Sequence, residues 1–320
     1  MNAGVAKTRV SPSADGDVRH VLNPGSATLQ KMLAVAVILL PLTGVIVATI
    51  MLWYQGINIV EIVSLAAMYV IIMLAVTVGF HRYFAHRSFS TQPAIQVLFG
   101  VLGSMAAQGP LVFWVSTHRR HHAFSDQPGD PHSPNLHGTG IQGMMRGLWH
   151  AHIGWMFSEA QVSDWVTFAR DILQNRTLFK IHKQYFLWVL TGLAIPPLVG
   201  GLITHSSMAA FQAFLWGGPV RMFLVNNATW CLGSICHYFG NSPFETRDHS
   251  ANNFWVALFT FGDGNQNNHH AFPGSYKHGL QWWEPDVTAR VIRLLEIAGL
   301  VWQLKTPSKS AILNCKKART

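Results

Sequence analysis

Four apolar stretches, each long enough to cross a lipid bilayer, constrain this chain more than any other feature of its sequence. A helix needs about 20 apolar residues to span the hydrocarbon core of a bilayer. The turns between the first and second stretches, and between the third and fourth, are both short. We therefore expect four membrane-spanning helices, arranged as two hairpins, over about 33–54, 57–80, 185–204 and 208–237.

The distribution of basic residues predicts the orientation of these helices. Nearly every Lys and Arg lies in the N-terminal tail, in 81–183, or after residue 244, and neither short turn carries one. Loops on the cytosolic side of a membrane are enriched in Lys and Arg. We therefore expect a multi-pass protein of the cell inner membrane, with both termini and both large polar segments in the cytosol.

Composition supports a membrane protein and narrows its partners. Only 12% of residues are charged, about half the roughly 25% of an average soluble domain. The net charge of +9 suits anionic lipid headgroups or an acidic carrier or redox partner. The basic residues are scattered among Trp and Phe without a basic helix or a finger pattern, which argues against a nucleic-acid partner.

A fifth apolar stretch, 93–115, is interrupted by Gln108, Gly109 and Pro110. It is long enough to be a fifth transmembrane helix. We predict instead a re-entrant or interfacial segment, because the histidines before and after it need to meet on one side of the membrane. The expected organisation is a cytosolic tail, a membrane domain and a cytosolic C-terminal segment, over 1–30, 31–285 and 286–320.

Eight of the 17 histidines lie at or just beyond the expected cytosolic ends of apolar stretches. On a helix, residues three and four apart share a face, so the motif HRRHH can offer imidazoles to two adjacent metal ions. Imidazole suits iron, copper, zinc and nickel, and spacing alone does not choose among them. The predicted ligands of one shared site are His81, His86, His118, His121, His122, His237, His269 and His270.

The remaining histidines fall into two groups. Four are close enough to the motifs to support the ligands by hydrogen bonds: His132, His150, His152 and His249. Five are expected to have no part in the site: His20, His137, His182, His205 and His278. A metal-bound imidazole usually donates its second N–H to a fixed partner. The predicted partners are Asp130, Glu245, Asp248, Asn252 and Asn267.

The motifs and their order resemble the membrane fatty acyl desaturases of the stearoyl-CoA, or delta-9, type, in particular the bacterial members. The likeness covers most of 30–285, and its motifs are TVGFHRYFAHRSF, THRRHHAFSDQPGDPHSP, NATWCLGSICHYFG and NNHHAFP. The resemblance implies an all-α integral membrane fold of four transmembrane helices with a cytosolic helical cap. It also implies a di-iron centre held by the eight histidines, O2 as co-substrate and a narrow, kinked tunnel for an acyl chain. Electrons would come from a separate ferredoxin, rubredoxin or cytochrome b5 with its reductase.

The implied activity is that of a desaturase, which removes two hydrogens from an acyl chain to form a C=C bond. An acetylenase acting on an acyl carrier protein substrate, which forms a triple bond, and an acyl hydroxylase are alternatives. A non-catalytic metal-binding membrane protein is a more remote one. Three tryptophans are expected to line the acyl channel, with interfacial anchoring as the alternative: Trp149, Trp155 and Trp255.

Two departures from the family pattern concern the metal site. Gln266 stands where the family's third histidine motif normally begins with His. Gly233 stands where the family commonly has an Asn that reaches a metal through water. One imidazole and one amide of the family site are therefore missing, and Gln266 is an uncertain ligand.

A third departure concerns the group that carries the acyl chain. Acyl-CoA enzymes of the family place Arg and Asp before the second histidine motif and further basic residues after the segment that follows it. This chain has Ser116, Thr117, Ser158 and Glu159 at these places. Because CoA phosphates need cations in fixed positions, we expect a carrier-protein thioester or a membrane lipid rather than acyl-CoA. The alternative is that other basic residues bind CoA, among them Arg119, Arg120 and Arg146.

Overall fold

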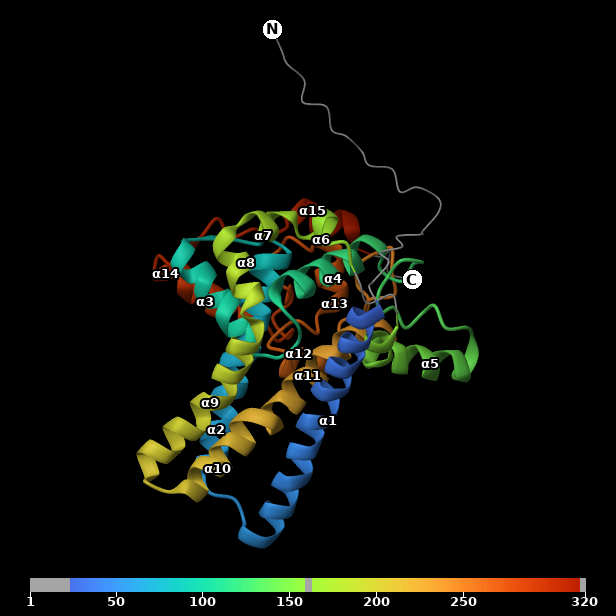
Figure 1. Ribbon diagram of the computed structural model, residues 1–320. Helices are drawn as coiled ribbons and strands as arrows, with labels where there is room; N and C mark the ends of the chain where they lie inside the picture. The colour runs from blue at the N-terminus through green and yellow to red at the C-terminus, as the bar shows by residue number, and fades with distance from the viewer. Residues whose placement is uncertain (1–23, 159–162, 317–320) are drawn as a thin grey trace.

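The computed structural model describes residues 24–158 and 163–316. Long helices extend from a cap of shorter helices and loops, and the cap lies at one end of the molecule (Figure 1). The first hairpin consists of α1 (Pro24–Gln55) and α2 (Ile59–Leu74), and the second of α9 (Tyr185–Thr204) and α10 (Ser207–Leu215). Most of the expected tail lies outside the described residues, and α1 begins at Pro24, within the range 1–30.

Four helical segments of the described chain are long and apolar enough to cross a membrane. They are Thr28–Gln55, Ile59–Ala85, Tyr185–Thr204 and Ser207–His237. Their outward-facing side chains, such as Leu40 and Ile203, are exposed and apolar, as expected for helices that contact lipid tails. The prediction of a four-span, all-α membrane protein is confirmed.

The second span changes its helix type where it enters the cap. From Ala75 to Ala85 it forms a π-helix, η1, and the backbone N–H of His86 donates to the carbonyl of His81 at 3.1 Å. In an α-helix of 3.6 residues per turn, the side chains of residues five apart point in directions about 140° apart around the helix axis. The wider turn, closed by bonds between residues five apart, brings the two rings to within 4.9 Å.

The fourth span is also irregular. It runs from α10 through a π-helical turn, η4 (Trp216–Val220), into α11 (Arg221–Gly233), and ends in η5 (Ile235–His237). Pro219 lies in the π-helical turn, and a proline within a helix removes a backbone donor. The buried side chain of Arg221 donates to the carbonyls of Gly217 and Met105, both at 3.2 Å.

The apolar stretch 93–115 forms two helices. α3 (Pro93–Ser104) and α4 (Leu111–Phe124) are separated by a break in which Ala107 and Gly109 have positive φ angles of 60° and 108°. With 12 residues, α3 is about 18 Å long at 1.5 Å per residue, shorter than the roughly 30 Å hydrocarbon core. It packs against η1 and α8 within the cap.

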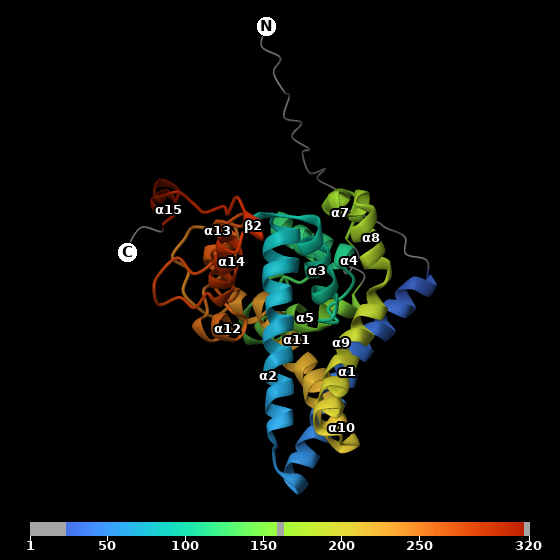
Figure 2. The same ribbon diagram turned by 90° about the vertical axis from the view of Figure 1, so that its left-hand side faces the viewer.

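The rest of the cap consists of short helices and one small sheet. Strand β1 (Ser90–Thr91) pairs antiparallel with β2 (Val301–Trp302), with Ser90 opposite Trp302. The expected C-terminal segment from residue 286 is thus joined to the cap by β2 and by α14 (Figure 2). The remaining helices are α5 (Gly140–His152), η2 (Gly154–Phe157), α6 (Trp165–Phe168), α7 (Arg170–Gln174), α8 (Arg176–Lys183), α12 (Phe254–Phe259), α13 (Gln266–Ala271), α14 (Val287–Ile297) and α15 (Lys309–Cys315).

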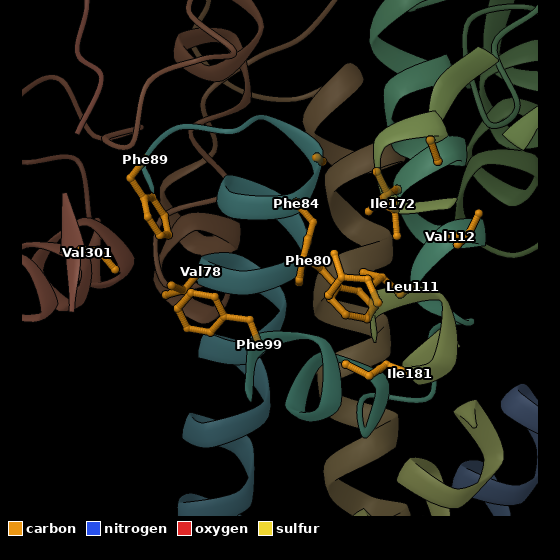
Figure 3. Packing of buried hydrophobic residues seen from close by; sticks show 14 of the residues in the cluster. Val78, Phe80, Phe84, Phe89, Phe99, Leu111, Val112, Ile172, Ile181 and Val301 are labelled. Atoms are coloured by element: carbon orange, nitrogen blue, oxygen red, sulfur yellow. The ribbon is translucent and has the colours of Figure 1, made fainter. Parts of the chain in front are cut away.

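An apolar core within the cap holds η1 in place. The rings of Phe80 and Phe84 point from η1 toward Leu111 of α4, while Phe99 packs beside Val78 (Figure 3). A β-carbon at Gly103 of α3 would collide with the Phe80 ring. The close contact of α3 with η1 therefore fixes the helix that carries the first histidine motif.

Candidate metal centre

The structure brings the eight predicted ligands together in two adjoining clusters. Five of them have side-chain nitrogens within 4.8 Å of one another: His81, His86, His118, His122 and His269. The Nε2 atoms of His86 and His118 are 2.7 Å apart, and those of His81 and His269 are 3.0 Å apart. The Nε2 atoms of His122 and His269 are 2.9 Å apart. These nitrogens converge on one space, and we call this group the five-histidine cluster.

The second group, the three-histidine cluster, contains His121, His237 and His270, whose ligand atoms also lie within 4.8 Å of one another. The Nε2 atoms of His237 and His270 are buried and have no hydrogen-bond partner in the described part of the chain. Buried polar atoms in folded proteins almost always have a partner. Two unpaired imidazole nitrogens facing a common space fit a bound metal ion.

The motif HRRHH divides between the two clusters. His118 and His122, four residues apart on α4, belong to the five-histidine cluster, and their ring centroids are 4.6 Å apart. His121 belongs to the three-histidine cluster. The arrangement is the one expected from the spacing, in which one helical turn serves two metal positions.

Buried carboxylates orient four of the eight imidazoles. Each accepts a hydrogen bond from a histidine Nδ1, which leaves Nε2 directed into a cluster. The pairs are Asp263 with His81 at 2.7 Å, Asp130 with His121 at 3.0 Å, Asp126 with His237 at 2.9 Å and Asp248 with His270 at 2.6 Å. A metal ion held by neutral imidazoles would thus be compensated by the negative charges of the aspartates that are hydrogen-bonded to those imidazoles.

The electrostatics favour neutral, coordinating imidazoles at four positions of the five-histidine cluster. Burial, reinforced by neighbouring imidazoles, lowers the pKa of His86, His118, His122 and His269 well below the usual value. His121 differs: burial alone would lower its pKa, but the adjacent carboxylate of Asp130 raises it.

Two histidines outside the predicted ligand set also lie at the site. His278 is 1% exposed, its ring centroid is 4.4 Å from that of His269, and its Nδ1 lies 3.2 Å from Asp263. The expectation that His278 has no part in the site is therefore wrong. The ring of His132 stacks on His121 with centroids 4.4 Å apart.

The predicted supporting partners are partly corrected by the structure. Asp130 and Asp248 hold histidines as expected, whereas Asp126 and Asp263 were missed. The side chain of Asn267 instead pairs with the backbone N–H and C=O of Phe244, at 2.8 and 3.2 Å. Two further predicted partners bond to groups outside the clusters: Asn252 pairs with Asn268, and His152 with Ser234 and Asn227.

The two family departures lie beside the clusters. Gln266 is buried, and its Nε2 donates to the backbone carbonyl of Asp263 at 2.8 Å. A β-carbon at Gly233 would lie 3.1 Å from Nδ1 of His132, and this Nδ1 has no hydrogen-bond partner among the described residues. His132 therefore occupies part of the space that a larger residue at position 233 would fill.

A cavity of about 130 Å³ opens directly onto the histidines. Its walls are mainly apolar and aromatic, and three cluster members line it: His81, His118 and His121. Of the three predicted channel tryptophans, Trp155 lines this cavity. Trp149 and Trp255 are 62% and 68% exposed and lie outside it. Trp149 lines a separate surface hollow beside Arg146, as an interfacial residue would.

Membrane-spanning helices that carry histidine clusters suited to metal ions, beside an apolar cavity, indicate the class of membrane-bound enzymes that act on apolar chains. A family model for fatty acid desaturases matches residues 59–295. The chain is 43% identical to a hex-5-enoyl-[acyl-carrier protein] acetylenase of Moorena producens over 314 residues, 98% of each chain. It is 36% identical to an sn-1 stearoyl-lipid 9-desaturase of Synechocystis over 242 residues, 75% of this chain and 70% of the relative. The sn-1 stearoyl-lipid 9-desaturase of Anabaena variabilis is 35% identical over 237 residues, 74% of this chain and 80% of the relative.

The chain therefore belongs to the fatty acid desaturase family, and it is a membrane oxidoreductase of that family.

Proposed function

We propose that this protein uses O2 and two histidine-bound iron ions to remove two hydrogens from a fatty acyl chain and form a C=C bond. The observation that carries the proposal is the contact between the apolar cavity and the histidine clusters. An alkyl chain in that cavity has its methylene groups beside the imidazoles that would bind the ions.

The protein's own contribution is to position groups and exclude water. Bound iron would activate O2, the oxidant, and the protein fixes the metal and the chain relative to each other. Five histidines would hold one ion and three the other, and the four aspartates keep the imidazoles in their orientation. Phe113, Trp114 and Trp230 in the cavity wall shield the reacting carbons from water.

We further propose that the acyl chain is bound to a carrier protein or a lipid rather than to CoA. Arg119 is already held by the carboxylate of Asp171 and the backbone carbonyls of Phe84, Ala85 and Phe168. Ser116 is buried and bonds within its own helix. Positions 116 and 119 therefore supply no available cation for the CoA phosphates.

The membrane orientation and the electron donor are further parts of the proposal. The cap contains both histidine clusters and most of the basic residues, so it would lie in the cytosol with both termini. Its positive charge suits an acidic electron donor such as a ferredoxin, a rubredoxin or cytochrome b5.

A second product, a triple bond, is favoured by one comparison. The acetylenase of Moorena producens matches this chain over 98% of both sequences, whereas the Synechocystis desaturase matches over 75% of this chain. Removal of two further hydrogens from an alkene at the same site would convert a desaturase into an acetylenase.

The test is product analysis with purified, iron-loaded protein in lipid nanodiscs. Hexanoyl, hex-5-enoyl and stearoyl chains, each on a carrier protein or on a lipid, are supplied with O2 and a reduced ferredoxin and its reductase. His121→Ala and His270→Ala should abolish the product, whereas His205→Ala, an exposed histidine in the short turn of the second hairpin, should not.

Loss of two hydrogens from a saturated chain supports a desaturase, and loss of two from hex-5-enoyl chains supports an acetylenase. Gain of one oxygen would replace both by a hydroxylase. Absence of product on every chain, with iron bound and electrons delivered, would refute the proposal.

A further inference from the structure

Three separate segments line the cavity beside the histidines, and on each of them one wall residue lies farthest from the histidine motif. The last wall residue on the second span is Val76, on the loop between α3 and α4 it is Gln108, and on α11 it is Thr229. On each segment a tightly buried residue lies about one turn further from the histidine motif. These are Met73, Met105 and Val225, which are 0%, 5% and 0% exposed.

These three residues belong to a single packed cluster together with Ala106. We call Met73, Met105, Ala106 and Val225 the methionine floor. Val76 is both a cavity wall residue and a member of the same cluster, and Trp114 of the wall packs against it. Because Val76 and Trp114 are shared between the cavity wall and this cluster, the packed side chains of the cluster form the end of the cavity. Protein interiors leave few voids, so no further space is expected behind them.

Polar contacts tie the floor together at two levels. Above it, the amide of Gln108 donates to Thr229 at 2.8 Å and to Asn226 at 3.2 Å. Below it, the Arg221 guanidinium donates to the backbone carbonyl of Met105 at 3.2 Å. A chain that pushed past this level would separate hydrogen-bonded groups in an apolar interior, which costs about 1–3 kcal/mol for each group left unpaired.

The depth available beyond the histidines is small. On α11, Gly233 lies beside His132 at the histidine end, and Thr229 is the last wall residue above the floor. Four residues of α-helix separate them by about 6 Å. Only a few carbons of an extended chain fit between these two levels.

From this geometry we infer that the methionine floor stops the methyl end of the acyl chain, so that the enzyme accepts short acyl chains and oxidises them near that end. The inference rests on the proposed acyl substrate and adds its length and the residues that limit it. An apolar pocket discriminates against one extra methylene by about tenfold or more. A long chain must displace the two methionines, which are flexible but already packed.

Binding rather than turnover provides the test. Carrier protein bearing amide-linked hexanoyl, decanoyl or hexadecanoyl chains is titrated calorimetrically against the full-length protein in nanodiscs. The wild type should bind the hexanoyl form at least about 100-fold more tightly than the hexadecanoyl form. Met73→Ala should improve decanoyl binding relative to hexanoyl binding by about tenfold.

Met222→Ala is the matched control, because Met222 is a buried methionine of α11 outside the floor. It should leave the chain-length profile unaltered. If Met73→Ala does not fold, as judged by thermal unfolding, Met105→Ala removes the adjacent part of the floor and should give the same shift.

Equal wild-type affinity for hexanoyl and hexadecanoyl forms would overturn the inference, as would a floor variant that folds but keeps the wild-type profile. Neither result depends on oxidation. An absence of oxidised product would instead count against the proposed function and leave the chain-length profile to be judged separately.

Discussion

Replacement of Asp248 by Asn isolates the contribution of one carboxylate to metal binding. Asp248 accepts a hydrogen bond from Nδ1 of His270 at 2.6 Å, and the two side chains are 6% and 3% exposed. An Asn oxygen can accept the same bond, so the geometry is kept while the negative charge is lost. A hydrogen bond to a charged group contributes about 1.5–3 kcal/mol and a neutral one about 0.5–1.5 kcal/mol.

The two hydrogen-bond energies differ by about 1–1.5 kcal/mol, so Asp248→Asn should lower the affinity of the three-histidine cluster for its metal ion roughly tenfold. Asp248→Ala also frees the imidazole to rotate, and its loss should approach 100-fold. The assay is iron retained per chain after equilibration with graded concentrations of chelator. The expected result is selective loss of one ion of two at a chelator concentration that leaves the wild type loaded.

Asp171→Asn is the matched control, because this carboxylate pairs with arginines and contacts no cluster histidine. Wild-type iron retention in both Asp248 variants would refute the reasoning that Asp248 supports a metal ligand.

Two further predictions concern positions near the clusters. Gly233→Asn should displace His132, because its β-carbon would lie 3.1 Å from Nδ1 of that imidazole; a changed absorption spectrum of the cobalt-substituted protein is expected, and an identical spectrum would contradict the prediction. Asp171→Asn should lower the melting temperature at neutral pH, because Asp171 anchors Arg119. Burial opposes ionisation of Asp171, but its arginine partners lower its pKa from 3.8 to about 2. Its ionised form therefore stabilises the fold above pH 3.8, and the difference in melting temperature between the two proteins should shrink as the pH falls from there toward 2. A constant difference over that range would exclude this ion pair as its source.

The spans and the eight clustered histidines could be predicted because each leaves a local mark in the sequence. Hydropathy over about 20 residues identifies a span, and a three- or four-residue interval identifies a helix face. His278 leaves no such mark. It reaches His269 through a loop whose backbone is held by Asp286, which accepts from the N–H of His278 at 2.7 Å.

The aspartates that hold the histidines also could be predicted only where they lie close in the sequence to the histidine that they hold. Asp130 and Asp248 were among the expected partners, but Asp126 and Asp263 bond to histidines that lie 111 and 182 residues away in the sequence. Asn267 was chosen for its place next to the third histidine motif. Its side chain points instead to Phe244, because residues two apart on a helix, such as Asn267 and His269, face nearly opposite directions.

The π-helical turn of the second span bears on how histidine motifs are compared between proteins. At the end of η1, the interval of five between His81 and the capping residue His86 places both rings on one face, whereas an α-helix does so with an interval of four. Deletion of one residue between them, combined with a return to α-helical bonding, would keep the pair aligned. The number of residues between two ligating histidines thus depends on the type of helix that carries them as well as on the geometry of the metal site. Two histidine motifs whose spacings differ by one residue can therefore form the same site.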